Sequence, residues 1–197
     1  MTEEEIRKII KGELSERRYR HVCGVVGEAE RLARIHGIDP EKARLAALLH
    51  DSTKEYTVEA QLKMLSDCGI MVDKDTLACP QVLHALSGSV RARRDFGAPD
   101  DVAEAIRTHA TGGPGMTKLQ LLIYVSDLTE PTRDFAAGLA DLRKLSERSL
   151  EAAAAEEARM TLEREGARGR VIHPDTRKTY EYYINTLQEM RKRDDTD

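Results

Sequence analysis

The 197-residue chain contains no tryptophan, two phenylalanines and three cysteines, and aromatic residues make up only 4% of it. The cysteines, Cys23, Cys68 and Cys79, are odd in number and lack metal-type spacing, which argues against a disulfide framework and favours reduced thiols. No apolar run approaches the roughly 18 residues that span a bilayer. The N-terminus lacks the cationic start and apolar stretch of a signal peptide. We therefore expect a cytoplasmic protein with no membrane partner.

Charge of one sign is not concentrated anywhere in the chain, whose formal net charge is −4. Basic residues are scattered or stand in short groups, which is typical of solvated faces and predicts no nucleic-acid surface. Alanine, leucine, glutamate, arginine and lysine dominate, and these residues favour helix. The length is sufficient for one domain with a core of its own.

Helix caps and apolar stripes predict an all-α fold. Thr2 and Glu5 form a capping box for the first helix, which Gly12 can end. No segment shows the alternation of a strand, and the glycine-rich segments at 111–115 and 166–169 predict loops. Counting the caps, the predicted helices are Thr2–Gly12, Ser15–Gly37, Asp39–His50, Thr57–Gly69, Pro80–Phe96, Pro99–His109, Leu119–Leu128, Phe135 to about Glu165 (one helix or two) and Asp175–Met190.

Polar residues interrupt several of the apolar helix faces. Burying an unpaired charge costs several kcal/mol or more, so such groups are normally paired or bound to a metal. A lone histidine on such a face is more often hydrogen-bonded to a backbone carbonyl, and His36 and His173 are left out of the site for that reason. Carboxylates on the same kind of face change the interpretation. The set is His21, His50, Asp51, His84, His109 and Asp127.

Four imidazoles and two carboxylates on inward faces of separate helices predict a metal centre. A mixed nitrogen and oxygen ligand set suits transition metals better than calcium or magnesium. Small residues before His50, such as Ala46 and Ala47, allow neighbouring helices to approach closely. The metals that such a ligand set suits are iron, manganese, zinc and nickel.

The order His21, His50–Asp51, Asp127 resembles the H…HD…D signature of the HD-domain metal-dependent phosphohydrolases. Flanking residues are similar to the YqeK branch of that family, the bacterial symmetrical bis(5′-nucleosyl)-tetraphosphatases. The resemblance covers nearly the whole chain. The similar segments are Arg18–His21, Leu48–Lys54, Leu83–Gly88, Ile106–Gly112, Tyr124–Arg133 and Ile172–Thr176.

The resemblance implies a single-domain HD-type helical bundle over residues 1–197, with a metal-binding core at about 15–135 and C-terminal helices at 136–197 packed on it. It implies an acid-anhydride hydrolase that cleaves diadenosine tetraphosphate to two ADP. A homodimer is a possible assembly, because Ala152–Ala155 and the last helix can pack within the domain or across an interface.

The implied mechanism uses two divalent transition-metal ions about 3.5–4 Å apart that share a hydroxide. Iron is expected first, with manganese, zinc, nickel or cobalt as alternatives. One ion would be held by His21, His50, Asp51 and Asp127, and the other by His84, His109 and a bridging, catalytic Asp51. Further residues would contact the substrate. These are Lys54, as catalytic phosphate clamp or leaving-group stabiliser, Arg133 as a bidentate phosphate ligand, Thr111 in the glycine-rich loop, and Arg20.

The chain departs from the family pattern at Ala110, where a threonine is usual, and at Ser126, where an alanine is usual. Neither change removes an expected ligand. Two alternatives stay open. One is an HD phosphohydrolase for a deoxynucleotide, a cyclic dinucleotide or a guanosine alarmone. The other is a non-catalytic helical signalling or scaffold domain.

Overall fold

The computed structural model describes residues 1–133 and 138–194. Over these residues it contains eleven α-helices, one 3₁₀ helix and no strand, which confirms the all-α prediction. The elements are α1 (Glu3–Glu13), α2 (Glu16–His36), α3 (Pro40–Leu49), α4 (Val58–Asp67), α5 (Lys74–Ala78), η1 (Pro80–Val82), α6 (Leu83–Phe96), α7 (Asp100–Thr108), α8 (Lys118–Thr129), α9 (Leu139–Arg148), α10 (Leu150–Ala167) and α11 (Pro174–Asp194).

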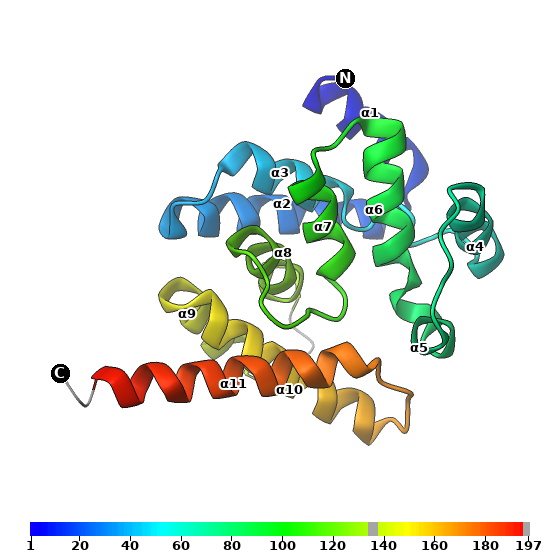
Figure 1. Ribbon diagram of the computed structural model, residues 1–197. Coiled ribbons are helices and arrows are strands. Elements are labelled where there is room, and N and C mark those ends of the chain that lie inside the picture. Colours follow the sequence, from blue (N-terminus) through cyan, green and yellow to red (C-terminus); the bar gives the residue numbers. More distant parts are fainter. Residues whose placement is uncertain (134–137, 195–197) are drawn as a thin grey trace.

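The core lies where α2, α3, α7 and α8 pack on one another, with α6 against α7 (Figure 1). Ala43, Ala46 and Ala47 of α3 are fully buried and let this helix lie close to its neighbours. Gly88 does the same for α6, because a methyl group there would lie 3.3 Å from the carbonyl oxygen of His50. Small residues therefore let α3 pack closely on its neighbours and let α6 approach the His50–Asp51 pair.

The last two helices form an antiparallel hairpin that crosses one end of the core (Figure 1). α10 packs against α8, α9 and α11. Its alanines Ala153 and Ala154 are fully buried within the chain. The loop between α10 and α11 consequently lies beside the core helices, at the side where α5 and η1 are found.

Three details of the fold differ from the sequence prediction. α1 runs through Gly12 and ends at Leu14, whose extended backbone terminates it. Pro80 begins a short 3₁₀ turn, and the α-helix starts at Leu83. The five-residue α5, capped by Asp73, was not predicted, because it is too short to show an apolar period.

The segment after Phe135, predicted as one helix or two, forms two helices that meet at Ser149, which caps α10. Phe135 itself, and the predicted boundary near residue 136, lie outside the described residues. None of the helices in the two described ranges is long and apolar enough to cross a bilayer.

Candidate metal centre

Five helices bring the six predicted ligands to one place. His21 lies on α2, His84 is the second residue of α6, and Asp127 lies on α8. His50 and His109 follow the last residues of α3 and α7. Asp51 comes next after His50. Two overlapping sets have ligand atoms that all lie within 4.8 Å of one another, and each could hold a metal ion: His21, His50 and Asp127, and His50, Asp51 and His109.

The Asp51 carboxylate lies between two pairs of histidines. Its Oδ2 atom is 3.6 Å from Nε2 of His21 and 3.4 Å from Nε2 of His50. Its Oδ1 atom is 3.3 Å from Nε2 of His84 and 3.8 Å from Nε2 of His109. Asp127 belongs to the first pair, with Oδ1 3.1 Å from Nε2 of His21. One carboxylate thus faces two groups of nitrogen ligands with its two oxygens.

The ring orientation of His50 and His109 follows from their positions at helix ends. The last carbonyls of a helix have no partner inside it. His50 Nδ1 donates to the Ala47 carbonyl at 2.6 Å, and His109 Nδ1 donates to the Ile106 carbonyl at 2.6 Å. With the proton held on Nδ1, the Nε2 atom of each ring is left to act as a ligand.

His21 is oriented by a buried carboxylate instead. Its Nδ1 donates to Oε1 of Glu130 at 3.1 Å, and Glu130 also accepts hydrogen bonds from the backbone and hydroxyl of Thr132. Gly24 makes room, because a side chain there would overlap the Glu130 carboxylate. A carboxylate behind a ligating histidine is the usual outer partner in metal sites. Sequence reasoning missed Glu130, although it lies three residues after Asp127 at the end of α8.

The turn that carries Glu130 and Arg133 is held by a second residue that the sequence did not single out. Arg143 of α9 donates to the carbonyl oxygens of Thr129, Glu130 and Arg133 at 2.8, 3.0 and 2.6 Å. Three bonds from one planar guanidinium fix the backbone of this turn. Arg143 thereby positions the carboxylate that orients His21.

The buried donor set fits a transition metal. The Nε2 atom of His50 makes no hydrogen bond within the described part of the chain, although it is fully buried. The Nε2 atoms of His84 and His109 are 3.0 Å apart, so only one of them can carry a proton. Neutral imidazoles and carboxylates with free lone pairs are the ligands that iron, manganese, zinc and nickel accept. The cluster is therefore suited to hold divalent metal.

The charges at the centre match that role. Burial lowers the pKa of His84 well below its ordinary value, helped by the Lys54 charge. Burial also lowers the pKa of His109 to about 4. Burial alone would raise the pKa of Asp51, but His50 and its other cationic neighbours hold it well below the ordinary value. At neutral pH the centre therefore offers the neutral rings of His84 and His109 beside an ionised carboxylate. Burial lowers the pKa of His50 as well, but the neighbouring Asp51 charge more than offsets this effect and raises it.

Two predicted substrate residues lie directly beside the ligands. The Lys54 ammonium is 3.2 Å from both ring nitrogens of His84 and donates to the Gln81 carbonyl at 3.3 Å. Arg133 donates to Asp127 at 2.6 Å and lies 3.4 Å from Nε2 of His21. Both cations can reach a phosphate that approaches the centre.

The other two lie farther out. Arg20 borders a cavity next to His21, but its side chain is 66% exposed and pairs with Glu16. The Thr111 hydroxyl donates to the Gly112 carbonyl, and Thr111 lines a neighbouring cavity rather than those next to the centre. Their roles in substrate binding stay predictions.

Arg18 contacts the centre where Arg20 does not, with its guanidinium 2.7 Å from Oδ2 of Asp51. It precedes His21 by three residues and so shares its helix face, a signal that the sequence contained. The ring of His36, which was left out of the predicted site, hydrogen-bonds the Ser146 carbonyl oxygen. His173 was also excluded, yet it lines a cavity that reaches His84 and Asp127. Only tertiary structure brings it there.

Comparisons with known proteins agree with this geometry. The HD domain family matches residues 18–165. The chain is 34% identical to a symmetrical bis(5′-nucleosyl)-tetraphosphatase of Bacillus subtilis (strain 168), over 94% of this chain and 99% of the relative. It is 33% identical to a protein of the same name from Halalkalibacterium halodurans, over 88% of this chain and 92% of the relative.

A solved structure has the same fold. It is a crystal structure described as a predicted HD superfamily hydrolase involved in NAD metabolism from Clostridium acetobutylicum. It matches with a TM-score of 0.90 and 33% identity, over 94% of this chain and 98% of the other. The chain is therefore an HD-domain hydrolase and belongs to the YqeK-like family of symmetrical bis(5′-nucleosyl)-tetraphosphatases.

Proposed function

We propose that the chain hydrolyses diadenosine tetraphosphate at its central anhydride bond and releases two ADP, with two divalent transition-metal ions as cofactors. The observation that carries this proposal is the Asp51 carboxylate, whose two oxygens face two separate histidine pairs. The chain belongs to this family and brings all six expected ligands together, so it has the side chains that metal-dependent phosphoanhydride hydrolysis requires.

The ligands divide into two sets. His21, His50 and Asp127 would hold one ion, His84 and His109 the other, and Asp51 would serve both. When bound, such a pair of ions lowers the pKa of water and neutralises charge on phosphate oxygens. Seven bonds from six residues leave coordination positions open for water and substrate, which a catalytic centre requires. Iron is the proposed physiological metal.

Cationic side chains then act on the phosphates directly. The Lys54 ammonium is partly buried beside His84, where the low dielectric strengthens its attraction for a phosphate oxygen. Burial lowers the pKa of Lys54, and the Asp51 charge opposes that shift. Lys54 would stabilise the charge that develops on the leaving ADP. Arg133, on the His21 side of the centre, would bind an oxygen of the other half.

The products identify the reaction. Purified protein is incubated with diadenosine tetraphosphate, a cyclic dinucleotide, deoxynucleoside triphosphates and guanosine alarmones, each with iron, manganese, zinc, nickel or cobalt. We expect two ADP per diadenosine tetraphosphate. Release of ATP and AMP, or preference for another nucleotide, contradicts the proposed function. If the protein binds no metal and shows no activity with any added metal, the result favours a non-catalytic scaffold domain.

A pair of variants tests the centre itself. Asp51→Ala removes the carboxylate between the histidine pairs and should abolish both metal occupancy and turnover. Asp67→Ala is the control, because Asp67 is an exposed residue of α4 that pairs with Lys63 on the same helix. Full activity in a folded Asp51→Ala protein would refute the two-metal proposal.

A further inference from the structure

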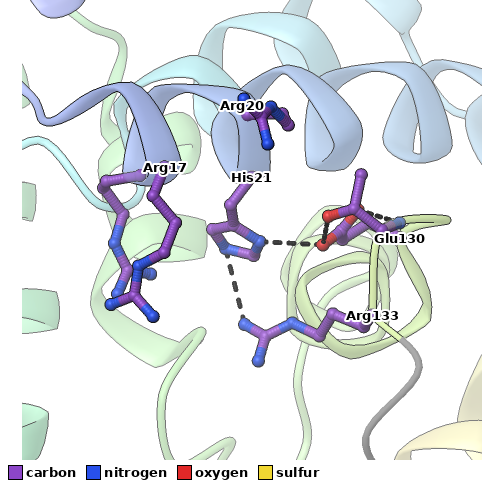
Figure 2. A pocket seen from close by; sticks show the side chains of 7 residues that line it. Arg17, Arg20, His21, Glu130 and Arg133 are labelled. Atoms are coloured by element: carbon purple, nitrogen blue, oxygen red, sulfur yellow. Dashed lines mark hydrogen bonds and ion pairs between the residues drawn. The ribbon is translucent and has the colours of Figure 1, made fainter.

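Two cavities reach the cluster of ligands from different ends. The arginine cavity, about 290 Å³, is lined by Arg17, Arg18, Arg20, His21 and Arg133 together with Glu130 and Thr132 (Figure 2). The hairpin cavity, about 210 Å³, reaches His84, Lys54 and Asp127 and extends outward between η1 and the α10–α11 hairpin. Because Oδ2 of Asp51 faces His21 and Oδ1 faces His84, the cavities lie on the two sides of this carboxylate.

Neither cavity is large enough for a whole dinucleoside polyphosphate. Pockets for drug-sized ligands measure roughly 300–1,000 Å³, and each cavity lies below that range. A molecule with two nucleosides and four phosphates that lies across the ligand cluster can extend into both. The central phosphates then lie over the ligand cluster, which is where the proposed cleavage takes place.

The chemistry of the two cavities differs. The arginine cavity has no aliphatic side chain in its lining, and Figure 2 shows Arg17 and Arg133 on either side of the His21 ring. Guanidinium groups bind phosphate through paired hydrogen bonds. The hairpin cavity is also lined by cations, Lys54, Arg164 and Arg170, but it adds the aliphatic side chains Val82, Val171 and Ile172 and hydroxyl groups such as that of Thr161. Aliphatic side chains give a base an apolar surface, and hydroxyl groups can hydrogen-bond a ribose.

The outer wall of the hairpin cavity is anchored to the core. Gln81 Nε2 donates to the Val171 carbonyl at 3.1 Å, and the ring of His173 hydrogen-bonds the Thr76 hydroxyl at 3.2 Å. These contacts link the loop after α10 to η1 and α5. The loop therefore has a fixed position beside the centre, and a wall that is held in place can discriminate between ligands.

We propose that the hairpin cavity binds the nucleoside of one half of the substrate, while the arginine cavity binds the phosphates of the other half. The C-terminal hairpin, which contributes Thr161 and Ile172, then sets the nucleoside preference. Only one nucleoside is enclosed. This inference rests on the proposed function, because it assigns the two halves of that substrate.

The test measures nucleoside and phosphate recognition separately, on full-length metal-loaded protein. Thr161→Phe fills the hairpin cavity from α10, and Ile172→Ala removes apolar surface from its loop. Glu163→Phe is the matched control, since Glu163 lies two residues from Thr161 and its side chain is 64% exposed outside the cavity. Dissociation constants are measured for ADP and for inorganic tripolyphosphate, which has no nucleoside.

We expect Thr161→Phe to weaken ADP binding at least about tenfold, as a misfit in an apolar pocket does, and Ile172→Ala to weaken it less. Tripolyphosphate binding should stay unchanged in both variants, and Glu163→Phe should change neither constant. Equal weakening of both ligands, or no weakening of ADP by either variant, overturns the inference. The wild-type products from diadenosine tetraphosphate are determined separately. Failure to form two ADP contradicts the proposed function, whatever the affinities of the variants.

Discussion

A single methyl group at Gly24 should weaken metal binding without touching a ligand. In Gly24→Ala the new Cβ overlaps the Glu130 carboxylate, which is fully buried and accepts the Nδ1 proton of His21. Displacing Glu130 would disturb the two hydrogen bonds that it accepts from Thr132. The overlap therefore displaces the partner that orients His21, and with it the Nε2 atom that points toward Asp127.

The expected change in the free energy of unfolding is the balance of two opposing effects. Replacing a glycine within a helix by alanine stabilises it by about 0.5–1 kcal/mol. Overpacking a filled site costs about 1–3 kcal/mol. We expect Gly24→Ala to lose up to about 2.5 kcal/mol, which lowers the melting temperature by up to about 10 °C in a chain of this size. Loss of an outer-shell partner lowers metal affinity by about 10- to 100-fold.

The control lies one turn farther along the same helix. A methyl group at Gly27 would meet no neighbouring atom within 4 Å, so Gly27→Ala gains helix propensity without a clash. It should stabilise the protein by about 0.5–1 kcal/mol and leave metal affinity unchanged. Thermal melts and titration of metal-free protein against a competing chelator measure both quantities. If both variants gain stability and bind metal equally, the role assigned to Glu130 is wrong.

Three further predictions concern other parts of the molecule. Burial, with the Asp127 charge nearby, raises the pKa of Glu157 well above its ordinary value. The unfolded chain therefore loses this proton at lower pH than the folded protein, and stability falls as pH rises above about 4.5, by up to about 1.4 kcal/mol per pH unit. In denaturant melts of chelated protein, Glu157→Gln should have the same free energy of unfolding as wild type at pH 4 and a larger one at pH 7. A difference that does not grow with pH would contradict the raised pKa of Glu157. Arg143→Ala removes three hydrogen bonds to carbonyls and should lower the free energy of unfolding by about 1.5–3 kcal/mol in the same melts. A loss below measurement error would show that the turn at residues 129–133 is stable without Arg143. A chelator should lower the melting temperature, because a site filled at a hundred times its dissociation constant adds about 2.7 kcal/mol; calorimetry that finds no shift would mean that the ions do not stabilise the fold.

Much of the fold was predictable because the chain marks its helix ends locally. Ser15 and Gly37 bound α2, and Asp39 caps α3, as expected from their side chains and from the left-handed backbone that Gly37 adopts. The prediction that Gly12 ends α1 was wrong, because glycine is also tolerated inside a helix and the extended backbone of Leu14 ends α1 instead. α5 carries too few residues for any period to be visible.

The ligands were predictable for a different reason, since each is a polar residue placed on an otherwise apolar helix face. The contact of Arg18 with the centre could have been predicted in the same way, because Arg18 shares a helix face with His21. Glu130 and Arg143 were harder, because their roles depend on hydrogen bonds to groups on other elements. His173 could not be placed at all, because only the packing of the C-terminal hairpin brings it beside α5 and the hairpin cavity.

The ligands come from helices that are far apart along the chain, which gives bound ions a topological effect. An ion held by His21 and Asp127 would act as a reversible cross-link that closes a loop containing α3, α6 and α7. Closing a loop restricts the unfolded chain, and the entropy removed grows with loop length. The link from α2 to α8 is the longest that the cluster can form. Loss of the ion at that end would therefore release more chain than loss of the ion at the His84 end.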